Sequence, residues 1–143
     1  MNWKNEAIER LTKYTAMVQA VENIPKEISR LEHDAREIHG FKPDRVSRIK
    51  NSGPRDDYMI GNIIKRQELG ASLENAKIWV EITDQALSVL SDEERNILEK
   101  MYVVPQRGVV SLLCSELGVE QSSVYRKRDQ ALYRFTMALY GAA

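Results

Sequence analysis

The sequence has little of what several classes of protein need. A single cysteine, Cys114, excludes an internal disulfide framework and a cysteine-rich metal site. The two histidines, His33 and His39, lack the spacing of three or four residues that would place two metal ligands on one helix face. No Gly-rich phosphate loop and no pairing of a nucleophile with a base is visible either. We therefore expect neither an enzyme nor a bound metal or other cofactor.

Long apolar runs are missing as well. No stretch approaches the roughly 18 consecutive apolar residues of a membrane-spanning helix. The N-terminal segment also lacks the apolar centre of a signal peptide. With one cysteine in addition, we expect a protein of a reducing, intracellular compartment that has no membrane contact.

Proline and glycine are scarce, with 4 and 7 residues respectively in a chain of 143. Long stretches without either favour helices joined by few loops. The formal net charge is zero, but it is unevenly distributed. Lys and Arg outnumber Asp and Glu in residues 41–55 and 105–143, whereas acidic residues dominate residues 56–104. A protein without net charge can bind a polyanion if one of its faces is basic.

Apolar residues recur at helical spacing through the first part of the chain. Between Trp3 and Asn23 they are three and four positions apart, which predicts one amphipathic helix. Pro25 is expected to interrupt this helix and to open a second one, which ends at Gly40. The predicted stripes contain Ala7, Leu11, Tyr14, Val18, Val21, Ile24, Ile28, Leu31, Ala35 and Ile38.

Residues 41–56 contain two prolines, one glycine and five Lys or Arg, which predicts an exposed basic loop. A purely solvated loop and a second phosphate contact are equal alternatives for it. A third helix is expected from about Asp57 to Val89. Its nearly heptad-spaced stripe is Met59, Ile63, Leu69 or Gly70, Leu73, Ala76, Val80, Thr83, Leu87 and Leu90. These stripes can be buried only against each other or against a second chain, so an antiparallel hairpin and an oligomer both stay open.

Ser91 begins a capping box, the arrangement in which a Ser hydroxyl and a Glu carboxylate each accept a backbone N–H at a helix start. Glu94 supplies the carboxylate, and the helix is expected to continue to about Val103. Pro105 and Gly108 then predict a turn. The residues that this helix is expected to bury are Ile97, Leu98 and Met101, with Tyr102 as a further candidate.

From Val109 onward the pattern is typical of a helix-turn-helix. A short helix is ended by Gly118 in a left-handed conformation, and a second helix begins near Gln121. Val124 is predicted at the centre of the buried face of the second helix. The predicted buried residues beside it are Ala131, Leu132 and Phe135, and those of the short helix are Val110, Leu113, Cys114 and Leu117.

The start of the second helix presents the candidate DNA-binding residues. They combine planar donors, hydroxyl groups and an aromatic edge, which suit base edges and phosphates in a major groove. Charge alone would make the basic triplet a solvated helix face, but its position in a recognition helix favours a contact with DNA. Arg126 is the best candidate for a base contact, and Lys127 and Arg128 for phosphate contacts, with a salt bridge as the alternative for Arg128. The full set is Gln121, Ser122, Ser123, Tyr125, Arg126, Lys127 and Arg128.

The segments LSDEERNILEKMY and SLLCSELGVEQSSVYRKRDQALYRF, within about residues 88–138, resemble region 4 of bacterial sigma factors. They resemble still more closely the phage transcriptional regulators of the ArpU and RinA type. The resemblance implies that the side chains at the start of the second helix lie where region 4 touches promoter bases. Two positions depart from the pattern, since Glu120 replaces a Thr or Ser N-cap and Lys127 replaces an aliphatic residue. No core-binding region 2 of a sigma factor is present.

The expected fold is all-α. An N-terminal antiparallel helical, coiled-coil-like region for oligomerisation or interaction (residues 1–87) precedes a sigma region 4-like helix-turn-helix domain (residues 88–143). The resemblance implies a sequence-specific regulator of phage or prophage late genes that binds double-stranded DNA in the cytoplasm of a bacterial host cell. Bacterial RNA polymerase, and a second copy of the chain bound through the N-terminal helices, are further candidate partners. The alternative is a phage DNA-packaging protein resembling a small terminase subunit.

Overall fold

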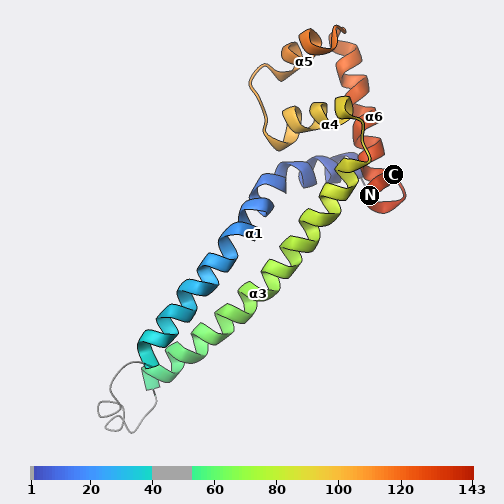
Figure 1. The fold of residues 1–143 in the computed structure, drawn as a ribbon. Helices are drawn as coiled ribbons and strands as arrows, with labels where there is room; N and C mark the ends of the chain where they lie inside the picture. The colour runs from blue at the N-terminus through green and yellow to red at the C-terminus, as the bar shows by residue number, and fades with distance from the viewer. Residues whose placement is uncertain (1, 40–52) are drawn as a thin grey trace. The chain divides into compact units, whose positions relative to one another are not determined.

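The computed structural model describes residues 2–39 and 53–143, and every regular element within these ranges is a helix (Figure 1). The all-α class expected from the sequence is therefore confirmed. None of the described helices is long and apolar enough to cross a membrane. The elements are α1 (Trp3–His39), α3 (Gly53–Ser88), α4 (Asp92–Leu98), the π-helical turn η1 (Glu99–Val103), α5 (Val109–Leu117) and α6 (Gln121–Tyr140).

The chain forms two compact units. The core unit consists of Met1–Val18 together with Ile78–Ala143, and the hairpin unit consists of Gln19–Lys77. The first turns of α1 and the last turns of α3 therefore pack with the C-terminal helices. The division between residues 87 and 88 predicted from the sequence lies at a different place from this division in packing.

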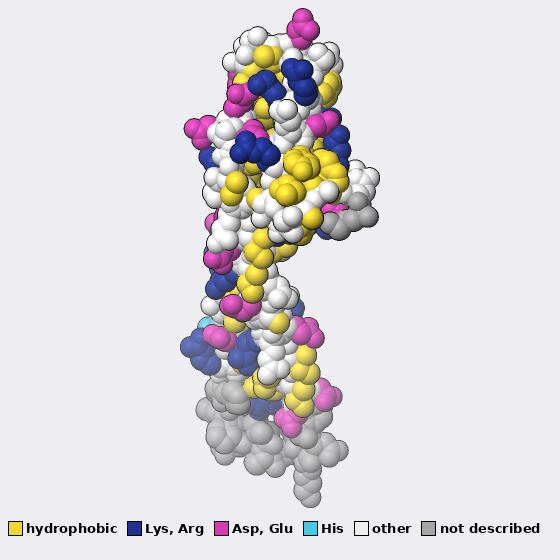
Figure 2. Space-filling model, turned by 90° about the vertical axis from the view of Figure 1, so that its right-hand side faces the viewer, with side chains coloured by type: hydrophobic (Ala, Val, Ile, Leu, Met, Phe, Trp, Pro, Cys, Tyr) yellow, Lys and Arg dark blue, Asp and Glu magenta, His cyan; other side chains and the backbone are white. Residues whose placement is uncertain are grey.

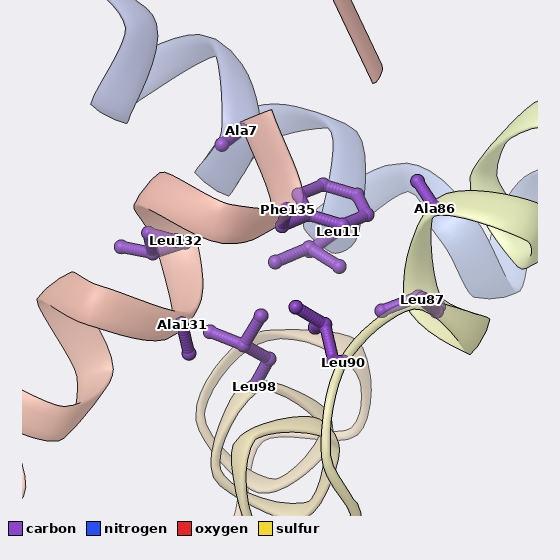
Figure 3. Packing of buried hydrophobic residues seen from close by; sticks show 9 residues of the cluster. All are labelled: Ala7, Leu11, Ala86, Leu87, Leu90, Leu98, Ala131, Leu132 and Phe135. Carbon is purple, nitrogen blue, oxygen red and sulfur yellow. The ribbon is translucent and has the colours of Figure 1, made fainter. Parts of the chain in front are cut away.

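The core unit is built around one apolar cluster to which four helices and the link before α4 contribute (Figure 3). Phe135 of α6 and Leu11 of α1 are fully buried and lie close together at its centre. Burial of such side chains contributes about 1.5–3 kcal/mol each, which is how the separate segments are held together. The buried members are Ala7, Leu11, Ala86, Leu87, Leu90, Leu98, Ala131, Leu132 and Phe135.

Polar contacts add to this packing between α1 and the end of α3. The guanidinium of Arg10 lies 4.6 Å from the ring centre of Trp79, and its Nε donates to Thr83 Oγ1 at 2.8 Å. Tyr14 donates its hydroxyl proton to Asp84. Burial and this hydrogen bond raise the pKa of Tyr14 to about 12, so Tyr14 stays a neutral donor at physiological pH.

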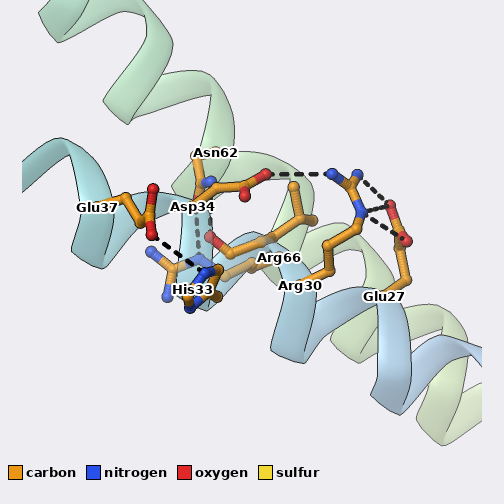
Figure 4. Close-up of polar contacts among 8 residues, drawn as sticks. Glu27, Arg30, His33, Asp34, Glu37, Asn62 and Arg66 are labelled. Atoms are coloured by element: carbon orange, nitrogen blue, oxygen red, sulfur yellow. Dashed lines mark hydrogen bonds and ion pairs between the residues drawn. The ribbon is translucent and has the colours of Figure 1, made fainter.

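In the hairpin unit, the second part of α1 and the first part of α3 run antiparallel (Figure 1). The predicted stripe of α3 placed Ile63 on the buried face, and this was wrong. Ile63 is 42% exposed, and the neighbouring Asn62 is buried in its place. Asn62 Nδ2 donates to the carbonyl of Leu31 at 2.9 Å, and its Oδ1 accepts from Arg66 Nε at 2.7 Å (Figure 4). A strict alternation of three and four positions from Met59 places position 62, not 63, on the buried face of α3. The two hydrogen bonds satisfy the buried amide of Asn62.

The prediction that Pro25 separates two helices was also wrong, because α1 continues through it as one helix. Pro25 is exposed, and the apolar side chains on either side of it, Val21 and Ile28, are partly buried while Leu31 is buried. A proline inside a helix removes one backbone hydrogen bond and costs about 3 kcal/mol. Burial of the flanking stripe offsets that cost.

The third predicted helix begins earlier than expected. The predicted start was Asp57, but α3 begins at Gly53, so the last four residues of the predicted loop 41–56 form its first turn. Pro54 fits this position because a proline needs no backbone N–H there. The remainder of the basic loop, with Lys42, Arg45, Arg48 and Lys50, lies outside the described residues.

The predicted capping box at the start of α4 is present. Glu94 donates its backbone N–H to Ser91 Oγ at 3.2 Å, and Ser91 donates its own N–H to Glu94 Oε1 at 3.1 Å. Ile97 and Leu98 are fully buried, as expected. The expected helix does reach Val103, but its last turn widens into the π-helical turn η1, in which the N–H of Val104 donates to the carbonyl of Glu99.

Candidate nucleic-acid interface

Two short-range features fix how α5 leads into α6. Gly118 ends α5 with a φ of 64°, a left-handed conformation that glycine adopts without steric cost. The N–H of Val119 then donates to the carbonyl of Cys114 at 3.2 Å, which closes the last turn. The turn Gly118–Glu120 follows, and α6 begins at Gln121, as predicted. Glu120 occupies the N-cap position without a side-chain cap hydrogen bond.

A second apolar cluster holds the two helices and α4 together. Ile97 of α4, Leu113 of α5 and Val124 of α6 are each fully buried in it. Cys114 is half-buried against this cluster as a packed thiol. Val124 therefore anchors the start of α6 to this cluster, and Gln121, Ser122 and Arg126 lie exposed beside it.

The buried face of α6 is the one predicted. Val124, Ala131, Leu132 and Phe135 have no exposed surface. Thr136 is buried as well, which the apolar pattern did not indicate, and its hydroxyl donates to the carbonyl of Leu132 at 2.8 Å. Serine and threonine hydroxyls commonly satisfy themselves in this way inside a helix.

The opposite face at the start of α6 carries the candidate DNA-binding residues. Gln121, Ser122 and Arg126 are exposed, and Ser123 and Tyr125 are half-buried. Gln121 Nε2 lies 3.4 Å from the hydroxyl of Tyr125, and Arg126 lies 3.4 Å from Ser123 Oγ. Both distances are at the long end for hydrogen bonds, so these donors are only weakly engaged within the protein.

The other two cations of the basic triplet have partners. Lys127 Nζ lies 2.6 Å from Glu93 Oε1 of α4. Arg128 lies 2.9 Å from Asp129 Oδ1 and 5.0 Å from the ring centre of Tyr125. Asp129 also accepts Lys4 Nζ at 2.9 Å. Although partial burial opposes it, hydrogen bonding to Lys4 and Arg128 holds the pKa of Asp129 below its ordinary value.

Arg107 is a candidate that the sequence argument did not include. It is exposed in the turn just before α5, and within the described residues neither Arg107 nor Arg126 has a carboxylate within ion-pair distance. Every other Lys or Arg between residues 92 and 143 has one. The position of Arg107 in a turn between Pro105 and Gly108 indicates that its side chain is exposed. Nothing in the sequence shows which cations lack a carboxylate partner.

Figure 2 shows the face of the molecule on which Lys and Arg side chains gather, interspersed with Asp and Glu, above a group of hydrophobic side chains. The exposed apolar residues of α6 include Tyr133, Met137 and Tyr140. Trp3 packs its ring edge-to-face on Tyr133, with ring centres 5.9 Å apart. The charge on this face is therefore mixed.

Within residues 2–39 and 53–143, no three His, Cys, Asp or Glu side chains gather in a way that could hold a metal ion. His33 is exposed, and its Nε2 lies 3.3 Å from Glu37 Oε1 (Figure 4). The side chain of His39 lies outside the described part of the chain.

Comparisons of the chain with protein-family models, with curated proteins and with solved structures found no match.

Proposed function

We propose that the chain is a sequence-specific transcriptional regulator of phage or prophage late genes that binds double-stranded DNA through the start of α6. The observation that carries this proposal is the contrast between the two faces of that helix. Val124 is fully buried, whereas Gln121, Ser122 and Arg126 are exposed. A helix whose buried face is packed on the core, and whose exposed face carries planar donors that are only weakly engaged, suits insertion into a major groove.

The side chains of this surface divide into two roles. Arg126 and Gln121 have the planar donor groups that pair with base edges, and Arg126 pairs most favourably with guanine. The hydroxyl groups and the remaining cations suit phosphates, which position a protein on DNA without specifying sequence. Arg107 joins them as a phosphate contact. The proposed phosphate-contacting set is Ser122, Ser123, Tyr125, Lys127, Arg128 and Arg107.

The resemblance of residues 88–138 to region 4 of sigma factors supports the same function, and it makes bacterial RNA polymerase a candidate second partner. A single module of this kind contacts few base pairs, so a second copy would supply a second half-site. In the hairpin unit, Ile60, Ile63 and Ile64 are 55%, 42% and 48% exposed on α3, which favours an association there. Light scattering tests this step, because a dimer suits a regulator whereas a ring of many subunits would favour DNA packaging.

Replacement of Arg126 by alanine is expected to weaken binding to a specific duplex by at least about 1 kcal/mol. The lost bidentate contact is the physical reason, and the fold should survive because Arg126 is exposed. The target duplex can be obtained by selecting bound fragments from the genome that flanks the gene, and affinity can be followed by fluorescence anisotropy over a range of salt concentrations.

Lys13→Ala is the matched control for charge. Lys13 is an exposed cation of α1 in the same compact unit, paired with Glu9 at 2.6 Å. Its replacement should leave the affinity for DNA nearly unchanged. If Arg126→Ala leaves both the affinity and its salt dependence as they are in the wild type, the recognition helix has been placed wrongly.

A further inference from the structure

The ion pair between Lys127 and Glu93 joins the proposed DNA-binding helix to the first turn of α4. The ammonium and carboxylate groups are 2.6 Å apart, and their side chains are 34% and 45% exposed. Water therefore reaches the pair, and so can a competing anion. Glu93 is favourably placed as an anion, because it lies at the positive end of the α4 helix dipole.

The neighbouring cation has a different status. Arg126 is exposed, and within the described residues its side chain makes one hydrogen bond, the long one to Ser123 Oγ. Further along the helix, Arg134 Nη1 is held by Glu94 at 2.7 Å. Carboxylates of α4 thus hold Lys127 and Arg134 of α6, whereas no carboxylate of the described residues lies within ion-pair distance of Arg126.

This arrangement affects specific and nonspecific binding unequally. Nonspecific affinity for DNA comes from cations that replace the counterions of phosphates, and each such contact raises the salt dependence. A lysine that must first break an ion pair with a carboxylate of the protein gains less binding free energy from a phosphate contact. A base contact by Arg126 is not reduced in this way, because that side chain has no carboxylate to leave.

We propose that Glu93 competes with DNA phosphate for Lys127, and that it thereby lowers affinity for duplexes of arbitrary sequence more than for the specific site. The inference rests on the proposed function, since it concerns the same surface. It predicts that the carboxylate of Glu93 reduces affinity, whereas an ion pair with a purely structural role would leave affinity unchanged.

The test is Glu93→Gln, which keeps the size of the side chain and removes its charge. The fold should persist, because the capping box uses Ser91 and Glu94 and not Glu93. Binding to a fluorescein-labelled duplex of random sequence should tighten about two- to fivefold, the range expected for loss of an exposed ion pair. The slope of log affinity against log salt should steepen by at most about 0.9, the value for one full phosphate contact, because Lys127 then meets phosphate without first leaving a carboxylate.

Two further variants make the result specific. In a Lys127→Gln background, Glu93→Gln should change affinity much less, because the competition requires the lysine. Glu74→Gln removes the same charge from a carboxylate that faces Lys77 at 3.8 Å in the hairpin unit, and it should not tighten binding. Circular dichroism checks that every variant is folded.

The outcomes separate the two proposals. If the wild type binds DNA and Glu93→Gln does not tighten binding, the competition by Glu93 is refuted while the DNA-binding function stands. Equal tightening with and without Lys127 would also refute it, because the effect would then be one of net charge. If no variant binds any duplex, the wild type included, the proposed function itself fails.

Discussion

Replacement of Phe135 by alanine is expected to lower the free energy of unfolding of the core unit by about 3–5 kcal/mol. Phe135 has no exposed surface and lies in the cluster to which α1, α3, α4 and α6 all contribute. Its removal would leave a cavity lined by segments that are far apart in the sequence. Neighbouring side chains such as Leu11 cannot fill it without moving their own helices, so little of the loss is recovered.

Urea denaturation followed by tryptophan fluorescence measures this effect selectively. The chain has two tryptophans, Trp3 and Trp79, and both belong to the core unit. Met137→Ala is the matched control on the same helix, because Met137 is 37% exposed and should cost less than about 1 kcal/mol. A midpoint for Phe135→Ala that matches that of Met137→Ala would contradict the described core. Phe135→Ala should bind DNA at urea concentrations at which it is still folded, and it should lose binding when it unfolds.

The sequence was sufficient for features that depend on neighbouring residues. The capping box of Ser91 and Glu94 and the left-handed Gly118 are set by local backbone geometry, and both were predicted. The buried face of α6 followed from helical periodicity, because Val124 and Phe135 lie on the apolar side of one regular helix. These are the features that orient the candidate site.

The errors arose where packing outweighs a local preference. Pro25 would end an isolated helix, but the stripe on both sides of it is buried, so α1 continues. An apolar pattern favoured Ile63 for the core, but the register of the hairpin buries Asn62 and satisfies its amide. Periodicity identifies a face of a helix, and it does not reveal which polar groups find hydrogen-bond partners.

The charges of the candidate site show the same limit. The sequence places Arg126, Lys127 and Arg128 side by side and treats them as a triplet. Their partners come from elsewhere in the chain or from the next residue, since Glu93 holds Lys127 and Asp129 holds Arg128. The ion pair of Lys127 is a tertiary contact, so the structure is needed to show that Arg126 is the member of the triplet without a carboxylate partner among the described residues.

The N-terminal segment supplies the last large prediction. Leu11→Ala is expected to destabilise the core unit by about 2–5 kcal/mol, although Leu11 belongs to the region in which the sequence predicted only oligomerisation or interaction. Leu11 is fully buried and lies beside Phe135, so the first turns of α1 complete the core on which α6 rests (Figure 3). The shift in the urea midpoint of tryptophan fluorescence measures the loss.

Thr12→Ala is the control for this prediction, because Thr12 is exposed and its hydroxyl donates to the carbonyl of Ile8 in its own helix at 2.7 Å. Alanine is also the better helix former, so the control should keep or slightly raise stability. If Leu11→Ala behaves like Thr12→Ala while Phe135→Ala is strongly destabilising, α1 does not contribute to the core. If Leu11→Ala destabilises as expected, a fragment of residues 88–143 alone would lack part of the support for α6, and tests of the proposed DNA binding require the full chain.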